Sequence, residues 1–399
     1  MTGTRPAPPA EEAVVHGLPV RMVAMPAAHT VGACLRVGAG SAADPAHPWG
    51  TAHLTEHVRI AAAGGEPAGS PLHIIGRTEN SETRFTMAGL AEQSTSIAGA
   101  LARLLHSGRT VDAAAFDAER HAVRLEGRAL STSPLLLLGP ASAEAAVPGA
   151  RMAAAASATA ETIGRISAAD VEAFTAEHYR PDNAVLTIAG ALPPRELLLE
   201  AIAETLTSAR SYRGSRRPEP ADGAAPPRPP LRLPPTLDGL LVLTLPAAGR
   251  GSLARSVARA LAGAGGPFVT GTAAAGHTLI GRTAVSAGEH EVAVLCWRDE
   301  PGLRTALATA FAAVIRADEP VVEAWRAAVL AEFQEHAFAR ESPLGRAQCE
   351  LLPPPQQPLP HLATCPPVLA DDLRRTAELG RVWRLRSGIL HASTTEEDR

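Results

Sequence analysis

Two histidines and a glutamate in the segment TAHLTEHV, residues 51–58, have the types and spacing of a metal site. His53 and His57 are four residues apart, so on a helix their side chains share one face, about 5–6 Å apart at Cβ. Two neutral imidazoles at this spacing can hold one Zn²⁺. Glu56 can reach a water on the same metal and accept its proton. The segment therefore predicts metal-assisted hydrolysis.

A catalytic zinc also needs a third protein ligand and one open position. The best candidates lie in DAERHAVRLEGR, residues 117–128, where Glu119 and Glu126 are two helical turns apart and share one face. One carboxylate can bind the metal while the other supports a ligand or water. The same spacing also fits a solvated charged stripe, and the histidine pair fits two surface side chains. The residues alone leave these alternatives open.

The site must be positioned by neighbouring helices and strands, which the sequence pattern predicts in both halves of the chain. Residues 14–25 and 30–37 have the pattern of a β-hairpin. Asp112 can cap the helix that carries Glu119 and Glu126, and Ser167 opens a further helix with a pattern close to a capping box. In the first half, the other predicted elements are helices at 49–60, 91–107 and 193–207 and strands at 82–90 and 184–189.

The proline-rich segment 213–235 cannot pack a core and marks a linker between two domains. We expect a disordered N-terminus at 1–12, a first domain at 13–212, a second domain at 236–390 and a tail at 391–399. Strands at 240–245 and 291–297 alternate with helices at 253–264, 303–317 and 321–338. The predicted fold class is α+β with two domains of comparable size.

Composition excludes several classes of protein. Apolar residues form 46% of the 399 residues, which excludes dominant disorder, and a net charge of −4 argues against a general nucleic-acid partner. No apolar run approaches the length of a membrane span. The four cysteines form no CxxC pair, and no secretory signal is visible, so a cytoplasmic location is expected.

Four stretches together resemble the M16 metallopeptidases, and most closely the short M16B type related to mitochondrial processing peptidase and pitrilysin. In family order they are HGLPVRMVAMP with RVGAGSAADP, GTAHLTEHV, FDAERHAVRLEGRAL and FTAEHYRPDNAVLTIAGAL. His53, Glu56 and His57 have the HxxEH order called inverzincin. The resemblance covers most of residues 14–207 and implies two domains, each a mainly antiparallel sheet packed with helices.

The resemblance also implies roles for five residues and a zinc-dependent endopeptidase activity. His53, His57 and Glu126 match the family's zinc ligands, Glu56 matches the catalytic base, and Glu119 matches the helper glutamate. A zinc hydrolase of unrelated fold is then disfavoured. We expect an extended peptide substrate to add to a sheet edge beside residues 82–90, with contacts from Thr83 and Phe85.

The sequence departs from the family pattern in three places. The interval between His57 and Glu126 is short, with the deficit at 61–71, and Ile75 stands where an asparagine commonly contacts the peptide. The second domain lacks the arginine and tyrosine pair that binds substrate in relatives, since the only tyrosines are Tyr179 and Tyr212. We therefore expect this chain to be the zinc-bearing subunit of a heterodimer (or a homodimer), whose M16-like partner supplies that pair.

Two functional interpretations follow. The absence of lysine and the abundance of alanine indicate a GC-rich genome, where leader-peptide removal from a modified peptide product is a plausible role for such a peptidase. The alternative is a non-catalytic peptide-binding or scaffold subunit of an M16-type complex that retains the zinc motif.

Overall fold

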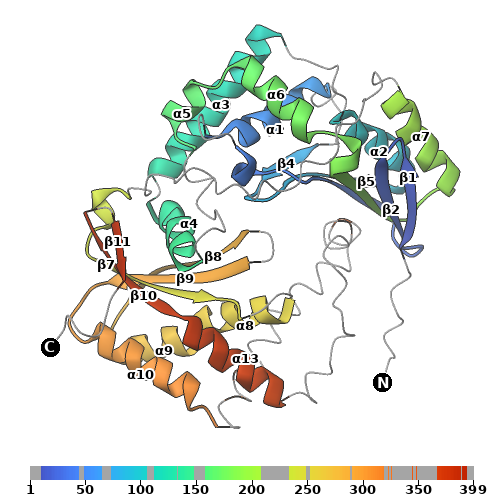
Figure 1. The fold of residues 1–399 in the computed structure, drawn as a ribbon. Coiled ribbons are helices and arrows are strands. Elements are labelled where there is room, and N and C mark those ends of the chain that lie inside the picture. Colours follow the sequence, from blue (N-terminus) through green and yellow to red (C-terminus); the bar gives the residue numbers. More distant parts are fainter. Residues whose placement is uncertain are drawn as a thin grey trace. The chain divides into compact units, whose positions relative to one another are not determined.

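The computed structural model of the chain forms two compact units, each built on one β-sheet (Figure 1). The structure describes residues 10–44, 49–64, 73–105, 112–132, 134–147, 158–207, 233–248, 252–287, 290–318, 366–387 and 389–392, together with 322, 325, 344 and 347. Unit 1 comprises Met1–Gly127, Ala158–Pro227 and Ala337–Pro354, and Unit 2 comprises Arg128–Ser157, Arg228–His336 and Pro355–Arg399. The predicted α+β class is confirmed.

The sheet of Unit 1 has six strands in the order β1-β2-β6-β3-β5-β4. All neighbouring strands pair antiparallel except β2 and β6, which are parallel. β5 lies between β3 and β4, so β4 is one of the two edge strands, and β1 is the other. The strands are β1 (Glu11–Val15), β2 (Leu18–Ala24), β3 (Thr30–Val37), β4 (Ile75–Thr78), β5 (Thr83–Leu90) and β6 (Ala184–Gly190).

The predicted hairpin between 14–25 and 30–37 is wrong in its pairing. The segment 14–25 contains its own two-residue turn, because His16 and Gly17 both have positive φ, as a type I′ turn requires. This turn makes β1 and β2 the hairpin. The apolar strand β6 then inserts between β2 and β3. Because β1 begins at Glu11, the expected disorder of 1–12 is also wrong at Glu11 and Glu12, while residues 1–9 lie outside the described part.

One face of the first sheet carries the main core of Unit 1. Alternate residues of the strands, such as Leu35, Phe85 and Leu186, point to this face, where helices α2 (Ser94–Arg103) and α7 (Arg195–Thr207) cover them. Alternation with period two explains why the intervening residues lie on the opposite face. The two helices contribute apolar residues at helical spacing, including Ile97, Leu101, Leu198 and Ile202.

A second, smaller core joins the helices that carry the predicted site. Helix α1 (Thr51–Ala62) contributes Leu54 and Val58, and helix α3 (Ala113–Thr132) contributes Phe116 and Val123. These residues pack with Ile163, near the end of α5 (Ala160–Gly164), and with α6 (Ala168–His178). Burying this apolar stripe of α1 against α3 fixes which side chains of the two helices face each other. The capping predictions are confirmed at Asp112 and Ser167, which receive backbone N–H bonds at the starts of α3 and α6.

Unit 2 is built on a five-stranded antiparallel sheet in the order β11-β10-β7-β9-β8. Its main core lies under helices α8 (Ser252–Ala262), α9 (Pro267–Ala274), α10 (Leu303–Ile315) and α13 (Pro366–Leu379). The strands are β7 (Leu240–Pro246), β8 (Leu279–Ala287), β9 (His290–Arg298), β10 (Arg381–Arg386) and β11 (Ile389–Ala392). The sequence predicted β7 and β9 but not β8, β10 or β11.

Helix α4 (Pro134–Ala146) belongs to Unit 2, although the expected first domain ran from 13 to 212. Its Leu138 and Ala141 pack on Val242 and Val294 of the second sheet, on the face opposite α8 and α10. The strongly apolar run of α4 needs a second apolar surface, and this sheet face supplies it. Strand β11 reaches Ala392, into the expected tail. Most of the predicted linker 213–235 and most of the predicted helix 321–338 lie outside the described residues.

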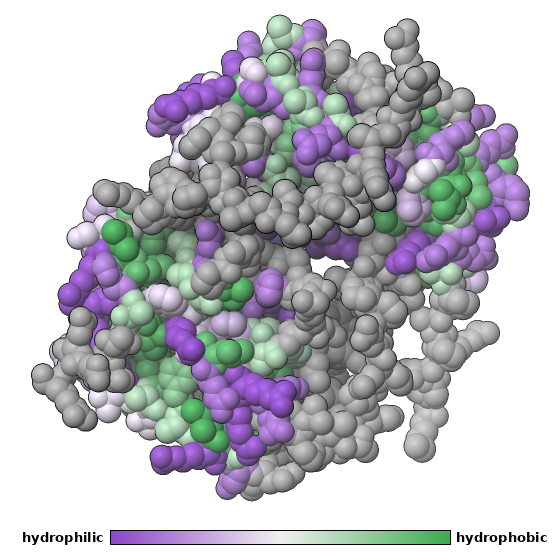
Figure 2. Space-filling model, in the orientation of Figure 1, coloured by the Kyte–Doolittle hydropathy of each residue, from purple (hydrophilic) through white to green (hydrophobic). Residues whose placement is uncertain are grey.

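The surface in Figure 2 mixes hydrophilic and hydrophobic residues over both units. Within the described part of the chain, no helix combines the length and the apolar character needed to cross a bilayer.

Candidate metal centre

His53, His57 and Glu126 converge at the contact between α1 and α3. One ligand atom from each lies within 4.8 Å of the others. The Nε2 atom of His53 is 3.4 Å from Glu126 Oε2, and Nε2 of His57 is 3.8 Å from Glu126 Oε1. The sequence placed the two histidines on one helix face, and the packing of α1 on α3 brings the distant carboxylate to them.

These distances fit the donor spacing of a tetrahedral zinc site. With zinc–ligand bonds of about 2.1 Å, neighbouring donors of a tetrahedron lie about 3.4 Å apart. The His53–Glu126 distance equals this spacing, and the His57–Glu126 distance exceeds it by only a few tenths of an ångström. The half-exposed Glu126 side chain leaves the cluster open to solvent, as a fourth ligand position requires. The residues present therefore fit a zinc ion with three protein ligands.

Glu119 supports the cluster from one side. Its Oε2 lies 3.2 Å from Nδ1 of His57, so the carboxylate accepts a hydrogen bond from that nitrogen. A ring that carries its proton on Nδ1 presents a lone pair on Nε2, the nitrogen that faces Glu126. Glu119, Val123 and Glu126 form one stripe of α3, and burial of Val123 orients both carboxylates toward α1. Glu119 thus orients a candidate ligand.

The charges of the cluster are mutually dependent. Burial alone would lower the pKa of His53, but the carboxylates of Glu126, Glu56 and Asp44 outweigh it and raise that pKa above its ordinary value. The pKa of Glu126 is lowered, chiefly by its hydrogen bond with His53. Without a cation between them, an imidazolium and a carboxylate neutralise each other, and a metal ion can replace the proton in that role.

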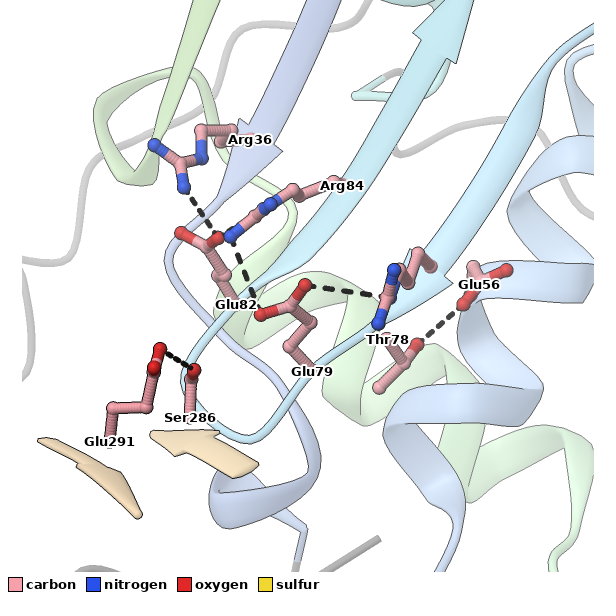
Figure 3. Close-up of polar contacts among 9 residues, drawn as sticks. Arg36, Glu56, Thr78, Glu79, Glu82, Arg84, Ser286 and Glu291 are labelled. Carbon is pink, nitrogen blue, oxygen red and sulfur yellow. Dashed lines mark hydrogen bonds and ion pairs between the residues drawn. The ribbon is translucent and has the colours of Figure 1, made fainter. Parts of the chain in front are cut away.

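Glu56 lies buried between α1 and the edge strand β4, with only 5% of its surface exposed. Thr78 donates a hydrogen bond of 2.6 Å from its hydroxyl to Oε2 of Glu56 (Figure 3). The other carboxylate oxygen occupies the space above Gly76, where an added Cβ would lie 2.1 Å from it. Gly76 and Thr78 therefore shape a slot that holds the Glu56 carboxylate.

Helix α1 is fixed at its start by a carboxylate that sequence reasoning missed. Asp44 accepts hydrogen bonds from the backbone N–H groups of Gly50 and Ala52, at 2.7 and 2.6 Å. Gly50 has φ of 101°, which suits glycine and turns the chain into the helix. Farther along α1, the buried Arg59 donates from Nε to the carbonyl of Leu104 at 2.8 Å. Both contacts hold the helix that presents His53, Glu56 and His57.

The expected substrate contacts at Thr83 and Phe85 do not fit the structure. Both residues are fully buried, Phe85 in the core under α2 and Thr83 with its hydroxyl donated to the carbonyl of Ala39. β5 is paired on both sides and offers no free edge. The edge strand next to β5 is β4, where Ile75 is exposed and where Gly76 and Thr78 contact Glu56.

The sequence pattern did not predict three residues that shape the site, Asp44, Gly76 and Thr78, for different reasons. Asp44 precedes the helix by several residues, outside the usual capping position, so only the SAADP loop hinted at it. Gly76 and Thr78 lie on a four-residue strand that carries no alternating apolar pattern. The only signal for β4 was its position shortly before the strand 82–90, across a short polar turn.

No family model matches the chain, and no curated protein matches it in sequence. Solved structures do resemble it over nearly their full length. A protease from Helicobacter pylori has a TM-score of 0.69 at 14% identity and covers 94% of this chain and 98% of its own. A candidate M16-like peptidase from Alicyclobacillus acidocaldarius has a TM-score of 0.65 at 16% identity, with 96% and 97% coverage.

A peptidase M16 inactive domain from Pseudomonas fluorescens is also similar, with a TM-score of 0.62 at 14% identity and 96% coverage of both chains. At these identities the likeness establishes the fold and nothing finer. The chain therefore shares the two-domain fold of these neighbours, of which one is named a protease, one an M16-like peptidase and one an inactive M16 domain.

Proposed function

We propose that this protein is a zinc-dependent endopeptidase of the M16 type. The observation that carries the proposal is the convergence of His53, His57 and Glu126, beside a buried carboxylate on the same helix as the two histidines. Convergence of these three donors with an adjacent base is the arrangement that hydrolysis at a metal requires. The M16-type fold supports the same reading.

Each residue has a defined task in the proposed reaction. His53, His57 and Glu126 hold the metal, and Glu119 keeps His57 in the tautomer that can bind. A zinc ion there would polarise the scissile carbonyl and acidify a water molecule. Glu56 accepts the proton of the attacking water and delivers it to the leaving amine. Thr78 and Gly76 hold the Glu56 carboxylate in place for both transfers.

The substrate in this proposal is an extended peptide that adds to the free edge of β4. Among the described strands, none pairs with that edge, and it borders the slot that holds Glu56. Backbone hydrogen bonds to β4 would hold the peptide next to the metal cluster. The exposed Ile75 stands where relatives commonly have an asparagine that contacts the peptide. The side chain of Ile75 cannot form a hydrogen bond to the substrate.

The experiment compares the wild-type protein with Glu56→Gln and with the control Glu161→Gln, which changes an exposed carboxylate. Zinc content is measured by mass spectrometry, and hydrolysis of an unstructured peptide is followed by chromatography. We expect about one zinc per chain in all three proteins and a loss of hydrolysis of about 10²–10⁴-fold in Glu56→Gln alone. Wild-type rates in Glu56→Gln would contradict the proposal.

We further propose that the active form is an assembly with an M16-like partner that supplies the arginine and tyrosine pair missing here. Leader-peptide removal is the role we favour for such an assembly. The purified chain alone would then be weakly active, and adding a partner encoded beside it would raise activity. Full activity of the isolated chain would exclude this assembly.

A non-catalytic scaffold subunit is the second candidate, favoured by the likeness to the domain named as inactive. The two candidates predict different metal contents. A scaffold with a vestigial site would be purified without zinc and would remain inactive in a zinc-saturated buffer, whereas the peptidase retains zinc through purification.

A further inference from the structure

Three arginines form a row across the first sheet, on the face opposite α2 and α7. In strand register, Arg36 of β3 pairs with Arg84 of β5, and Arg84 pairs with Arg77 of β4. Residues directly opposite each other on neighbouring strands have Cβ atoms only about 4.5–5.5 Å apart. The row therefore places three like charges side by side and ends at the free sheet edge.

Two carboxylates from the β4–β5 turn hold the row together (Figure 3). Glu82 bonds to Arg36 at 2.7 Å and also to Arg84, and Glu79 lies 3.4 Å from Arg84. Arg77 reaches Glu79 at 3.5 Å from its Nε. Among the described residues, two carboxylates therefore pair with three arginines: Glu82 is shared by Arg36 and Arg84, and Glu79 by Arg84 and Arg77.

The uncompensated charge falls on Arg77. The side chain of Arg36 is 11% exposed, whereas that of Arg77 is 78% exposed. Arg36 and Arg84 receive the closer carboxylate contacts, and Arg77 has the longest. A solvent-facing guanidinium whose neighbouring carboxylate is shared remains available to a further carboxylate, which it can bind with two parallel N–H donors.

Arg77 also has a fixed position relative to the proposed reaction. It lies between Gly76 and Thr78, the two residues that contact Glu56, and its side chain points to the other face of the strand. A peptide paired with β4 would place the side chain opposite Arg77 on that same face. That substrate residue would be next to the peptide backbone that faces Glu56.

We propose that Arg77 selects peptides with an aspartate or glutamate at the position that pairs with it on β4, immediately beside the cleaved bond. The inference rests on the proposed peptidase function and on pairing with β4. The bound carboxylate would complete the charge balance of the row, giving three cations and three anions. The substrate class is therefore an extended peptide with an acidic residue at the cleavage site.

The test uses a set of ten-residue peptides of neutral side chains in which one glutamate is moved through every position, each matched with a glutamine peptide. Wild-type protein loaded with zinc gives kcat/KM for each pair. Glu56→Gln gives binding by fluorescence anisotropy, independently of catalysis. At one position next to the cleaved bond, we expect glutamate to be favoured about fivefold over glutamine at low salt, with a smaller factor at high salt.

Arg77→Gln and Arg77→Glu identify the residue responsible, with Arg165→Gln as a matched control. Arg165 is also highly exposed and paired with one glutamate, but it lies directly after α5, as the residue that caps its C-terminus. Arg77→Gln should reduce the preference to less than twofold, and Arg77→Glu should reverse it, so that glutamine is favoured over glutamate at that position. Arg165→Gln should keep the wild-type preference.

The outcomes separate this inference from the proposed function. Zinc-dependent cleavage with no acidic preference at any position, or a preference that survives Arg77→Glu, overturns the role of Arg77 and leaves the peptidase intact. A protein that neither binds nor cleaves any peptide of the set overturns the proposed function and this inference with it.

Discussion

Glu56 and Glu291 are both buried carboxylates, one in each unit, yet their partners differ in kind. Glu56 accepts a hydrogen bond from the neutral hydroxyl of Thr78 and lies over Gly76. Glu291, with a side chain 0% exposed, receives two bonds from Arg259, at 2.6 and 2.9 Å, and one from Ser286 at 2.9 Å. The Glu56 carboxylate is thus held by neutral groups, whereas the charge of Glu291 is neutralised by the guanidinium of Arg259.

The difference shows that the bonding partners of a buried glutamate decide whether it can take part in catalysis or only stabilises the fold. A carboxylate bound by a guanidinium has its charge fully used, and removing it leaves a cation stranded. A carboxylate whose direct partner is a neutral hydroxyl is not neutralised by that partner, as a base in the proposed hydrolysis requires. Burial alone does not distinguish the two, so the comparison must be tested by variants that change the partners of each carboxylate.

The largest effect is expected for Gly76→Ala. The new Cβ would clash with the Glu56 carboxylate, which is the mobile end of a side chain, so the carboxylate moves and the strand folds normally. We expect kcat to fall about 10²–10⁴-fold with zinc content unchanged, because the base is displaced and the ligands are not.

Gly265→Ala is the matched control, because a Cβ at Gly265 meets nothing within 4 Å. It should retain wild-type activity. A Gly76→Ala variant with wild-type activity would mean that hydrolysis does not depend on the position of the Glu56 carboxylate. The proposed catalytic role of Glu56, in contrast to the structural role of Glu291, would then be wrong.

Glu291→Gln should destabilise the protein without changing the candidate metal centre. Loss of the negative charge strands the partly buried Arg259, and we expect the free energy of unfolding to fall by about 2–3 kcal/mol, less than for a fully buried pair. Urea denaturation followed by circular dichroism measures the change. Glu161→Gln, which breaks an exposed ion pair with Arg165, should change it by less than about 0.5 kcal/mol.

The smallest effect is expected for Glu119→Gln. The amide can still accept a hydrogen bond from Nδ1 of His57. It no longer carries the negative charge that makes the imidazole a stronger ligand for a metal ion. We expect zinc affinity to fall about 10–100-fold, measured by competition with a chelator, while folding is retained. An unchanged zinc affinity would mean that Glu119 does not support the site and belongs only to a solvated charged stripe on α3.

The sequence predicted the elements of the site better than their arrangement. The helices of His53 and Glu126 were predicted because their apolar spacing and the cap at Asp112 are local signals. The insertion of β6 between β2 and β3 was missed because strand order depends on pairing between distant segments, which no local pattern encodes. Likewise, no helix was predicted at residues 134–146, which simply fell within the expected first domain, because an apolar run does not specify which sheet it covers.

The candidate site was predictable to the extent that it lies on helices. His53, His57, Glu119 and Glu126 follow from helical spacing and from the resemblance, and the structure brings Glu119 to His57 and Glu126 to both histidines. Thr83 and Phe85 were assigned to substrate because a strand pattern does not say whether the strand is central or at an edge. Gly76 and Thr78 were not predictable, since a short edge strand has little pattern of its own.

The most direct test of the account is X-ray diffraction at the zinc absorption edge from crystals of the protein purified without added metal. The account predicts one anomalous peak per chain, about 2.0–2.2 Å from Nε2 of His53, Nε2 of His57 and the carboxylate of Glu126. Zinc bound to other residues, or no peak at these three even after soaking in zinc, would contradict it.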